Sequence, residues 1–167
     1  MTRRDGPRRS REESHLLNAA FCAVLSLRVA EGYSAEAARG MPFAILFIAM
    51  PILLHSATRE ALPRNTRTSL ASWLESNAAL RAGLADRARA LVPFVREGIL
   101  FGALHGALQL SGQGLVIPGR VVEPPEALTA SATANAKSCL ERARFVGRWL
   151  ARAGSPETVM TLWGVRP

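Results

Sequence analysis

Cysteine is almost absent from the 167-residue sequence, which contains only Cys22 and Cys139. The two lie far apart and neither belongs to a CxxC pair, so the sequence supports neither a disulfide framework nor a zinc site. The histidines and acidic residues are scattered, and no group of His, Cys, Asp and Glu has the spacing of metal ligands. We therefore expect no metal and no other cofactor.

Lysine is nearly absent as well. Twenty of the twenty-one basic residues are arginine, and Lys137 is the exception. The formal net charge is +8 and the isoelectric point is about 11.3. Arginine shares GC-rich codons with the abundant alanine, glycine and proline, so this basicity has two interpretations, codon usage or an anionic partner.

No hydrophobic run is long enough to cross a bilayer. The most apolar segment, residues 41–54, has fourteen residues and includes Pro51, whereas a transmembrane helix needs about 20 apolar residues. The Arg-rich beginning of the chain is not followed by the apolar region of a secretory signal. We predict that residues 41–54 form a central core helix, and that the protein stays in the cytoplasm without a membrane partner.

Catalytic motifs are also missing. The sequence has no nucleophile elbow, no phosphate-binding loop and no dinucleotide fingerprint. His15 and His105 are isolated, and His105 has no carboxylate in helical register to orient it. We predict that the protein is not an enzyme. An enzyme whose site is assembled from distant residues is the alternative, and it would show a deep polar pocket with converging side chains.

Helical periodicity dominates what is present. Residues 1–13 carry five arginines and three acids without apolar periodicity, and are expected to form a disordered tail. The remainder, residues 14–167, is expected to form one compact, mainly α domain of six or seven helices. Besides the core helix, the expected helices span residues 14–31 (ended by Gly32), 68–75, 78–110 (kinked or split at Pro93), 130–153 and 156–162.

Glycine spacing and turn residues add two local predictions. Gly98, Gly102 and Gly106 recur every four residues, so they share one side of a helix and indicate that another backbone packs closely there. Residues 115–117 and 120–122 flank Pro118-Gly119, which predicts one small β-hairpin at about residues 115–122.

Two groups of charged residues are candidate site residues. His55, Arg59, Glu60 and Arg64 follow the core helix, where they could organise a turn or bind a partner carboxylate or phosphate. The adjacent Arg96-Glu97 pair is flanked by apolar residues, and such charges are usually paired within the fold or at an interface. We favour organising or partner-binding roles for both groups over catalysis.

An ordered series of short motifs extends from about residue 18 to residue 106. Its members are Asn18–Ala23 (NAAFCA), Pro42–His55, Thr58–Pro63 (TREALP), Ser69, Trp73-Leu74, Leu80-Arg81, Arg87–Glu97 (RARALVPFVRE) and Phe101-Gly102. This series resembles the middle components of bacterial three-component ABC-type ATPase systems. The resemblance implies a role in bacterial conflict, namely antiphage defence, between an ABC-type ATPase subunit and a third component. It also implies no ATPase chemistry in this chain, which agrees with the missing phosphate loop.

We therefore predict a non-catalytic adaptor with those two partners, for which nucleic acid is a possible further partner through the complex. The alternative is a winged-helix-like DNA-binding regulator. A helix that ends near Leu110, followed by a hairpin with Arg120, has that outline. Against it, the helix before the hairpin holds glycine and apolar residues where base-reading side chains would be expected.

Overall fold

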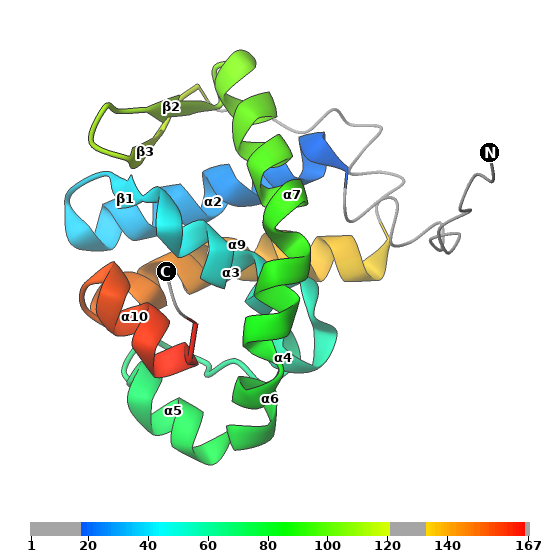
Figure 1. The fold of residues 1–167 in the computed structure, drawn as a ribbon, viewed down its shortest axis with the longest axis vertical. Coiled ribbons are helices and arrows are strands. Elements are labelled where there is room, and N and C mark those ends of the chain that lie inside the picture. Colours follow the sequence, from blue (N-terminus) through cyan, green and yellow to red (C-terminus); the bar gives the residue numbers. More distant parts are fainter. Residues whose placement is uncertain (1–17, 121–132, 166–167) are drawn as a thin grey trace, which may run out of the picture.

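The apolar segment at residues 41–54 forms the centre of the fold. In the computed structural model, which describes residues 18–120 and 133–165, it contains the 3-10 turn η1 (Phe43–Ile45) and helix α3 (Leu46–Leu54). The side chains of Ile45, Leu46 and Ile48 are fully buried. Helices α2 (Ala19–Ala37), α7 (Leu84–Leu104) and α9 (Ala134–Arg152) pack around α3, which confirms the predicted core helix (Figure 1).

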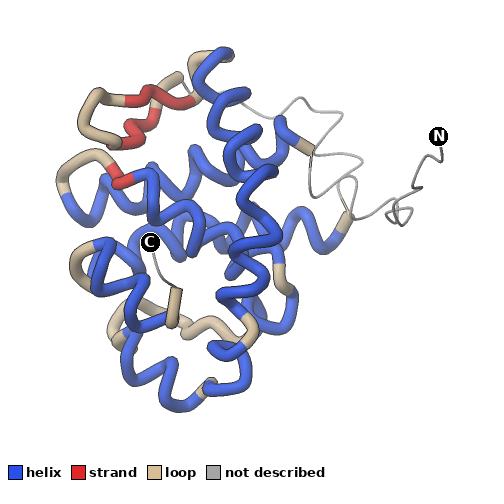
Figure 2. Tube along the Cα trace, viewed as in Figure 1, coloured by secondary structure: helices blue, strands red, loops and turns tan. Residues whose placement is uncertain are grey.

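Shorter helices complete a mainly helical fold, as predicted (Figure 2). They are α4 (Ser56–Glu60), α5 (Leu70–Ser76), α6 (Ala78–Ala82) and α10 (Pro156–Trp163). The described residues thus contain eight α-helices, of which six have seven residues or more. None of these helices combines the length and the apolar character that crossing a membrane requires. The predicted tail at residues 1–13 lies outside the described residues.

Side-chain caps determine where several helices begin. At four helices, a side-chain oxygen of the N-cap residue accepts a hydrogen bond from a backbone N–H of the first turn. These N-cap residues are Asn18, Ser69, Thr133 and Ser155. Such a bond satisfies one of the donors that the first turn leaves free. The predicted start at Ser14 lies outside the described residues, and α2 begins after Asn18.

Three predicted helices have other bounds in the structure. The core helix begins at Leu46 and not at residue 41 or 42, because Met41–Pro42 forms a short strand and Phe43–Ile45 forms the 3-10 turn η1. Gly32 does not end the first helix, because α2 continues to Ala37 and ends where Ala38 adopts a left-handed conformation with φ of 53°. The predicted helix 78–110 is divided at Gly83 into α6 and α7, continues through Pro93 without splitting, and ends at Leu104.

Gly32 remains helical because α9 packs directly on it. A Cβ at Gly32 would lie 2.8 Å from the carbonyl carbon of Arg144, and a Cβ at Gly147 would lie 2.8 Å from the backbone nitrogen of Tyr33. The two glycines therefore let the backbones of α2 and α9 approach more closely than any side chain would allow. The ion pairs Arg144–Glu31 (2.7 Å) and Arg152–Glu36 (3.0 Å) also join these helices.

Glycines also bring α7 against α2. A Cβ at Gly98 would lie 2.6 Å from the Cβ of Cys22, and one at Gly102 would lie 3.4 Å from the Cβ of Ala23. The predicted close backbone approach is therefore confirmed at Gly98, where the same Cβ would lie 3.1 Å from the carbonyl carbon of Cys22. At Gly102 the nearest atoms belong to the Leu108 side chain, at 2.8 Å and 3.0 Å from the Cβ position. Gly106 takes no part, because it follows the helix with φ of 74° and has no atom within 4 Å of its Cβ position.

The small sheet has three antiparallel strands in the order β1-β3-β2. Strand β3 (Leu115–Pro118) pairs with β2 (Leu108–Leu110) on one side and with β1 (Met41–Pro42) on the other. The turn lies at Ser111–Gly114, where the Ser111 N–H donates to the Leu115 carbonyl (2.9 Å) and Gly114 has φ of 72°.

The predicted hairpin exists, but its expected pairing was wrong. The strand paired with β3 across the turn precedes that turn, in residues that were expected to end a helix. The backbone N–H groups of Gly119 and Arg120 donate to the carbonyls of Ala107 and Gly106, both at 2.9 Å, so no turn reverses the chain at residues 118–119. Residues 121 and 122 of the expected second strand lie outside the described residues.

Three tryptophans pack together where helices α5, α9 and α10 meet. The ring of Trp73 on α5 lies 5.5 Å from that of Trp149 on α9 and 5.8 Å from that of Trp163 on α10. The indole N–H of Trp149 donates to the Thr68 carbonyl (2.8 Å). These contacts attach the short helices to the core formed by α2, α3, α7 and α9.

Alanine substitutions at the crossing glycines test this packing. We predict that Gly32→Ala and Gly147→Ala each lower the free energy of unfolding by about 2 kcal/mol, because a neighbouring backbone must move. Helix propensity alone would raise the free energy of unfolding by about 1 kcal/mol. Urea unfolding therefore distinguishes the two effects by sign, since a decrease indicates the close packing and an increase indicates propensity. Gly112→Ala is the control. Its Cβ would have no atom within 4 Å, and we expect a change within about 0.5 kcal/mol.

Candidate partner-binding site

Arg59 is buried and holds three helices together. Its side chain is 3% exposed. Its Nε donates to the Ser138 hydroxyl (3.0 Å), and its two terminal nitrogens reach the Leu53 carbonyl, the Cys139 sulfur (3.2 Å) and the Asn135 side-chain oxygen. A guanidinium provides several donors in a rigid plane, which suits this arrangement of acceptors on α3 and α9. The guanidinium of Arg59 thus joins α4 to α3 and α9, and an organising or partner-binding role for this residue stays a prediction.

The surroundings of Arg59 explain how a charged group is tolerated there. Leu53 lies in the last turn of α3, where backbone carbonyls have no partner within the helix and carry partial negative charge. Cys139 also donates its thiol hydrogen to this carbonyl (3.2 Å). The acceptors around the guanidinium are thus neutral groups that together stabilise its charge.

His55 caps the helix that carries Arg59. Its Nδ1 accepts a hydrogen bond from the Thr58 backbone N–H (3.3 Å) and lies 2.7 Å from the Thr58 hydroxyl. Partial burial lowers the pKa of His55, and the positive charges of Arg87 and Arg59 lower it further. The neutral imidazole that this favours is the form that can accept both hydrogens at Nδ1.

The other four candidate residues are exposed and lie on different elements. Glu60 ends α4 and Arg64 follows it, whereas Arg96 and Glu97 lie on α7. Among the described residues, no ion pair joins Arg96 or Glu97 to Arg59 or Glu60. The structure therefore divides the candidates into an internal pair, His55 and Arg59, and exposed charges whose role in partner binding stays a prediction.

Arg96 lies at an apolar groove that the sequence did not reveal. The groove encloses about 390 Å³ between η1, α3, α7 and the turn of the hairpin. We call this feature the apolar groove, and its lining residues are Phe43, Phe47, Arg96, Ile99, Leu100, Leu110, Ser111 and Gly114. It is mostly apolar, with Arg96 as the single charged residue among those that line it.

Large apolar side chains are unusually exposed around the apolar groove. Phe43 is 47% exposed, Leu100 is 59% exposed and Leu110 is 49% exposed. Leu104, one turn beyond Leu100 on α7, is 84% exposed. A contiguous apolar surface of this kind is typical of a protein or ligand interaction site.

The packing of α7 explains why its leucines face outward. Gly98 and Gly102 contact α2, and a residue two positions further along a helix is turned by about 200°, to the opposite side. Leu100 and Leu104 therefore point away from the core. The signal in the sequence was the stretch GILFGAL at residues 98–104, which is apolar on all sides although only its glycine side is buried.

Backbone contacts define the far wall of the apolar groove. The Phe43 N–H donates to the Gly114 carbonyl (3.0 Å), and the Phe43 ring lies 3.3 Å from where a Cβ of Gly114 would be. Phe43 also packs edge to face on Phe47, with ring centroids 6.1 Å apart. The hairpin turn and η1 therefore hold the two aromatic rings in place.

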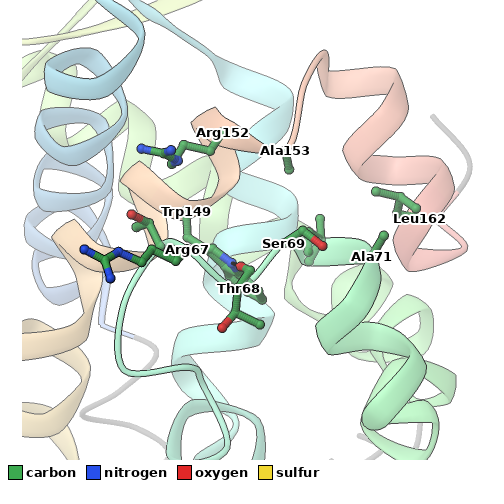
Figure 3. Close-up of a pocket in the computed structure, with 10 residues that line it drawn as sticks. Arg67, Thr68, Ser69, Ala71, Trp149, Arg152, Ala153 and Leu162 are labelled. Carbon is green, nitrogen blue, oxygen red and sulfur yellow. Dashed lines mark hydrogen bonds between the residues drawn. The ribbon is translucent and has the colours of Figure 1, made fainter.

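A second, more polar cavity of about 300 Å³ lies between α9, α10 and the segment before α5 (Figure 3). Its polar groups are largely engaged within the fold. Arg152 pairs with Glu36, the Ser69 hydroxyl accepts from the Ser72 N–H (3.2 Å), and Trp149 donates to the Thr68 carbonyl. The Trp149 bond ties the segment before α5 to α9, and we interpret this cavity as structural.

The described part of the chain offers no group of metal ligands, and its Cys22 thiol is not activated. Nowhere within it do three His, Cys, Asp or Glu side chains come together as a metal site needs. Burial, reinforced by the charge of Glu97, raises the pKa of Cys22 to about 12. Because the thiolate is the reactive form, Cys22 is a poor nucleophile at neutral pH.

The chain matches the family described as ABC-three component (ABC-3C) system Middle Component 3, over residues 7–167. It belongs to this family. The match confirms the resemblance carried by residues 18–106, and it extends over α9 and α10. No curated protein and no solved structure matches the middle component.

Substitutions at Arg59 and Arg64 compare how much a buried and an exposed arginine contribute to stability. We predict that Arg59→Met lowers the free energy of unfolding of the middle component by about 3 kcal/mol, because it removes the hydrogen bonds that the buried guanidinium donates to the Leu53 and Asn135 oxygens. Urea unfolding measures this change. The exposed Arg64→Met is the control and should change stability by at most about 0.5 kcal/mol. Equal losses in the two variants would contradict the buried role of Arg59.

His55 is expected to make stability depend on pH. Its pKa in the folded state lies below the ordinary value of about 6.5, so below that pH the unfolded chain binds the proton more readily. The contribution is therefore complete above about pH 6.5 and is lost as the pH falls towards the lowered pKa. We predict that His55→Asn, which keeps a capping oxygen but does not titrate, reduces the fall in urea midpoint between about pH 7.5 and pH 5. If the urea midpoint of His55→Asn fell as much as that of the wild type, this pH dependence would belong to other groups.

Proposed function

We propose that this middle component is a non-catalytic adaptor that links an ABC-type ATPase subunit to a third component in an antiphage defence complex. Membership in a three-component family supports the existence of such partners. The observation that carries the proposal is the apolar groove, whose exposed phenylalanine and leucines are suited to burial against another protein.

The construction of the apolar groove supports an adaptor role. Its walls belong to elements that are themselves held to the core, α7 by the glycine contacts with α2 and η1 by its bond to the hairpin turn. A preformed surface loses little conformational entropy when a partner binds, and this favours affinity. The middle component thus offers a rigid surface at the end of the molecule where the sheet lies (Figure 1).

The same surface argues against the DNA-binding alternative. A helix that reads bases in the major groove presents arginine, asparagine or glutamine to them. Here the helix before the hairpin exposes Leu100 and Leu104 at its last two turns. Arg120 is exposed beyond the hairpin, but the exposed Leu100 and Leu104 are better suited to a protein partner than to a phosphate backbone.

Co-purification tests the adaptor proposal. The tagged middle component is expressed with the other two components of its system, and size exclusion followed by mass spectrometry identifies what elutes with it. We predict a stoichiometric complex with both partners, and no ATP hydrolysis by the middle component alone. The tag on an unrelated protein is the control. A middle component that binds neither partner but binds DNA, more weakly as salt rises, would favour the regulator instead.

A further inference from the structure

We propose that the apolar groove binds an amphipathic helix from one of the other system components, and that an acidic residue of this helix pairs with Arg96. This inference rests on the proposed adaptor function and names where the partner binds. It would assign Arg96, Leu100 and Leu104 of α7 to the interface, together with Phe43 and Leu110 from η1 and β2.

The chemistry of the apolar groove favours a helix over an extended segment. An extended peptide brings a free N–H and C=O at nearly every residue, and each needs a partner once it is buried. Among the lining residues, only Arg96 and Ser111 have polar side chains. A helix satisfies its backbone groups internally and can present one apolar face.

The size of the apolar groove agrees with this mode of binding. Its volume of about 390 Å³ is near the lower end of the roughly 300–1,000 Å³ of ligand pockets. It can therefore hold a few side chains from one face of a helix, while the helix itself lies over Leu100 and Leu104 along α7. The exposure of these two leucines, 59% and 84%, provides the apolar surface that such a helix would cover.

The charge at the apolar groove indicates an acidic partner. Arg96 lines it, is exposed, and has no ion-pair partner among the described residues. Glu97, the next residue on α7, does not line the groove. The whole chain has a net charge of +8, so an acidic partner is attracted at long range, whereas a second copy of the chain is repelled.

The first experiment measures binding between the middle component and its purified partner components. We predict that Leu100→Glu and Leu104→Glu each weaken binding at least about tenfold, since both place a charge in an apolar interface. Arg96→Glu should also weaken binding and reduce its dependence on salt, as expected for a charge at the rim. Arg89→Glu is the matched control. Arg89 is an exposed arginine on the same helix, lies outside the groove, and should bind as the wild type does.

Urea unfolding of each variant separates loss of binding from loss of folding. Leu104 is 84% exposed, so Leu104→Glu should leave folding intact. This variant therefore tests binding even where another variant folds poorly.

The second experiment identifies the occupant. A photo-crosslinking amino acid at position 104 in the assembled complex should attach to a partner peptide with apolar residues at helical spacing and a nearby acidic residue. Cross-links only to a second copy of this chain would overturn the inference. So would a complex that assembles normally with Leu100→Glu and Leu104→Glu, although the adaptor proposal would then survive. If no complex forms with the wild-type chain, both proposals fail.

Discussion

The close approach of two helices to the backbone of α2 is the constraint on which the rest of the structure depends. Gly32 and Gly147 allow α9 to pack on α2, and Gly98 allows α7 to do the same from another side. The first contact places the acceptors of α9 within reach of the Arg59 guanidinium. The second turns the glycine side of α7 inward and therefore its leucines outward. One packing arrangement thus produces both the internal arginine site and the exposed apolar groove.

Arg59 shows why charge in a sequence is a poor guide to the surface. An arginine that follows an apolar helix suits a partner contact and a buried anchor equally well. What distinguishes the two is the position of its acceptors, and three of the four lie on α9, 76 to 80 residues further along the chain. The sequence therefore identified His55 and Arg59 as a polar group at a helix boundary, but it could not tell that Arg59 faces inward while Glu60 and Arg64 face solvent.

The predictions that held were local ones. A core helix within residues 41–54 and the close backbone packing at Gly98 followed from composition and spacing alone. The predictions that failed depended on partners remote in sequence. Gly32 resembles a helix terminator until α9 packs against it, and residues 108–110 read as the end of a helix until β3 pairs with them. The apolar groove was missed for the same reason, since its walls come from three separate parts of the chain.

This dependence on the whole fold links partner binding to stability. The apolar groove exists only when η1, α7 and the hairpin are all in place, so a partner that binds there binds the folded chain and not the unfolded one. Such a ligand adds about 2.7 kcal/mol to stability when its free concentration is 100 times its dissociation constant. Arg59, Gly32 and Gly147 lie in the core and do not line the groove, so their substitution would act on assembly only through the population of folded protein. A loss of assembly that is matched by a loss of stability therefore indicates the core, whereas a loss of assembly at unchanged stability indicates the groove.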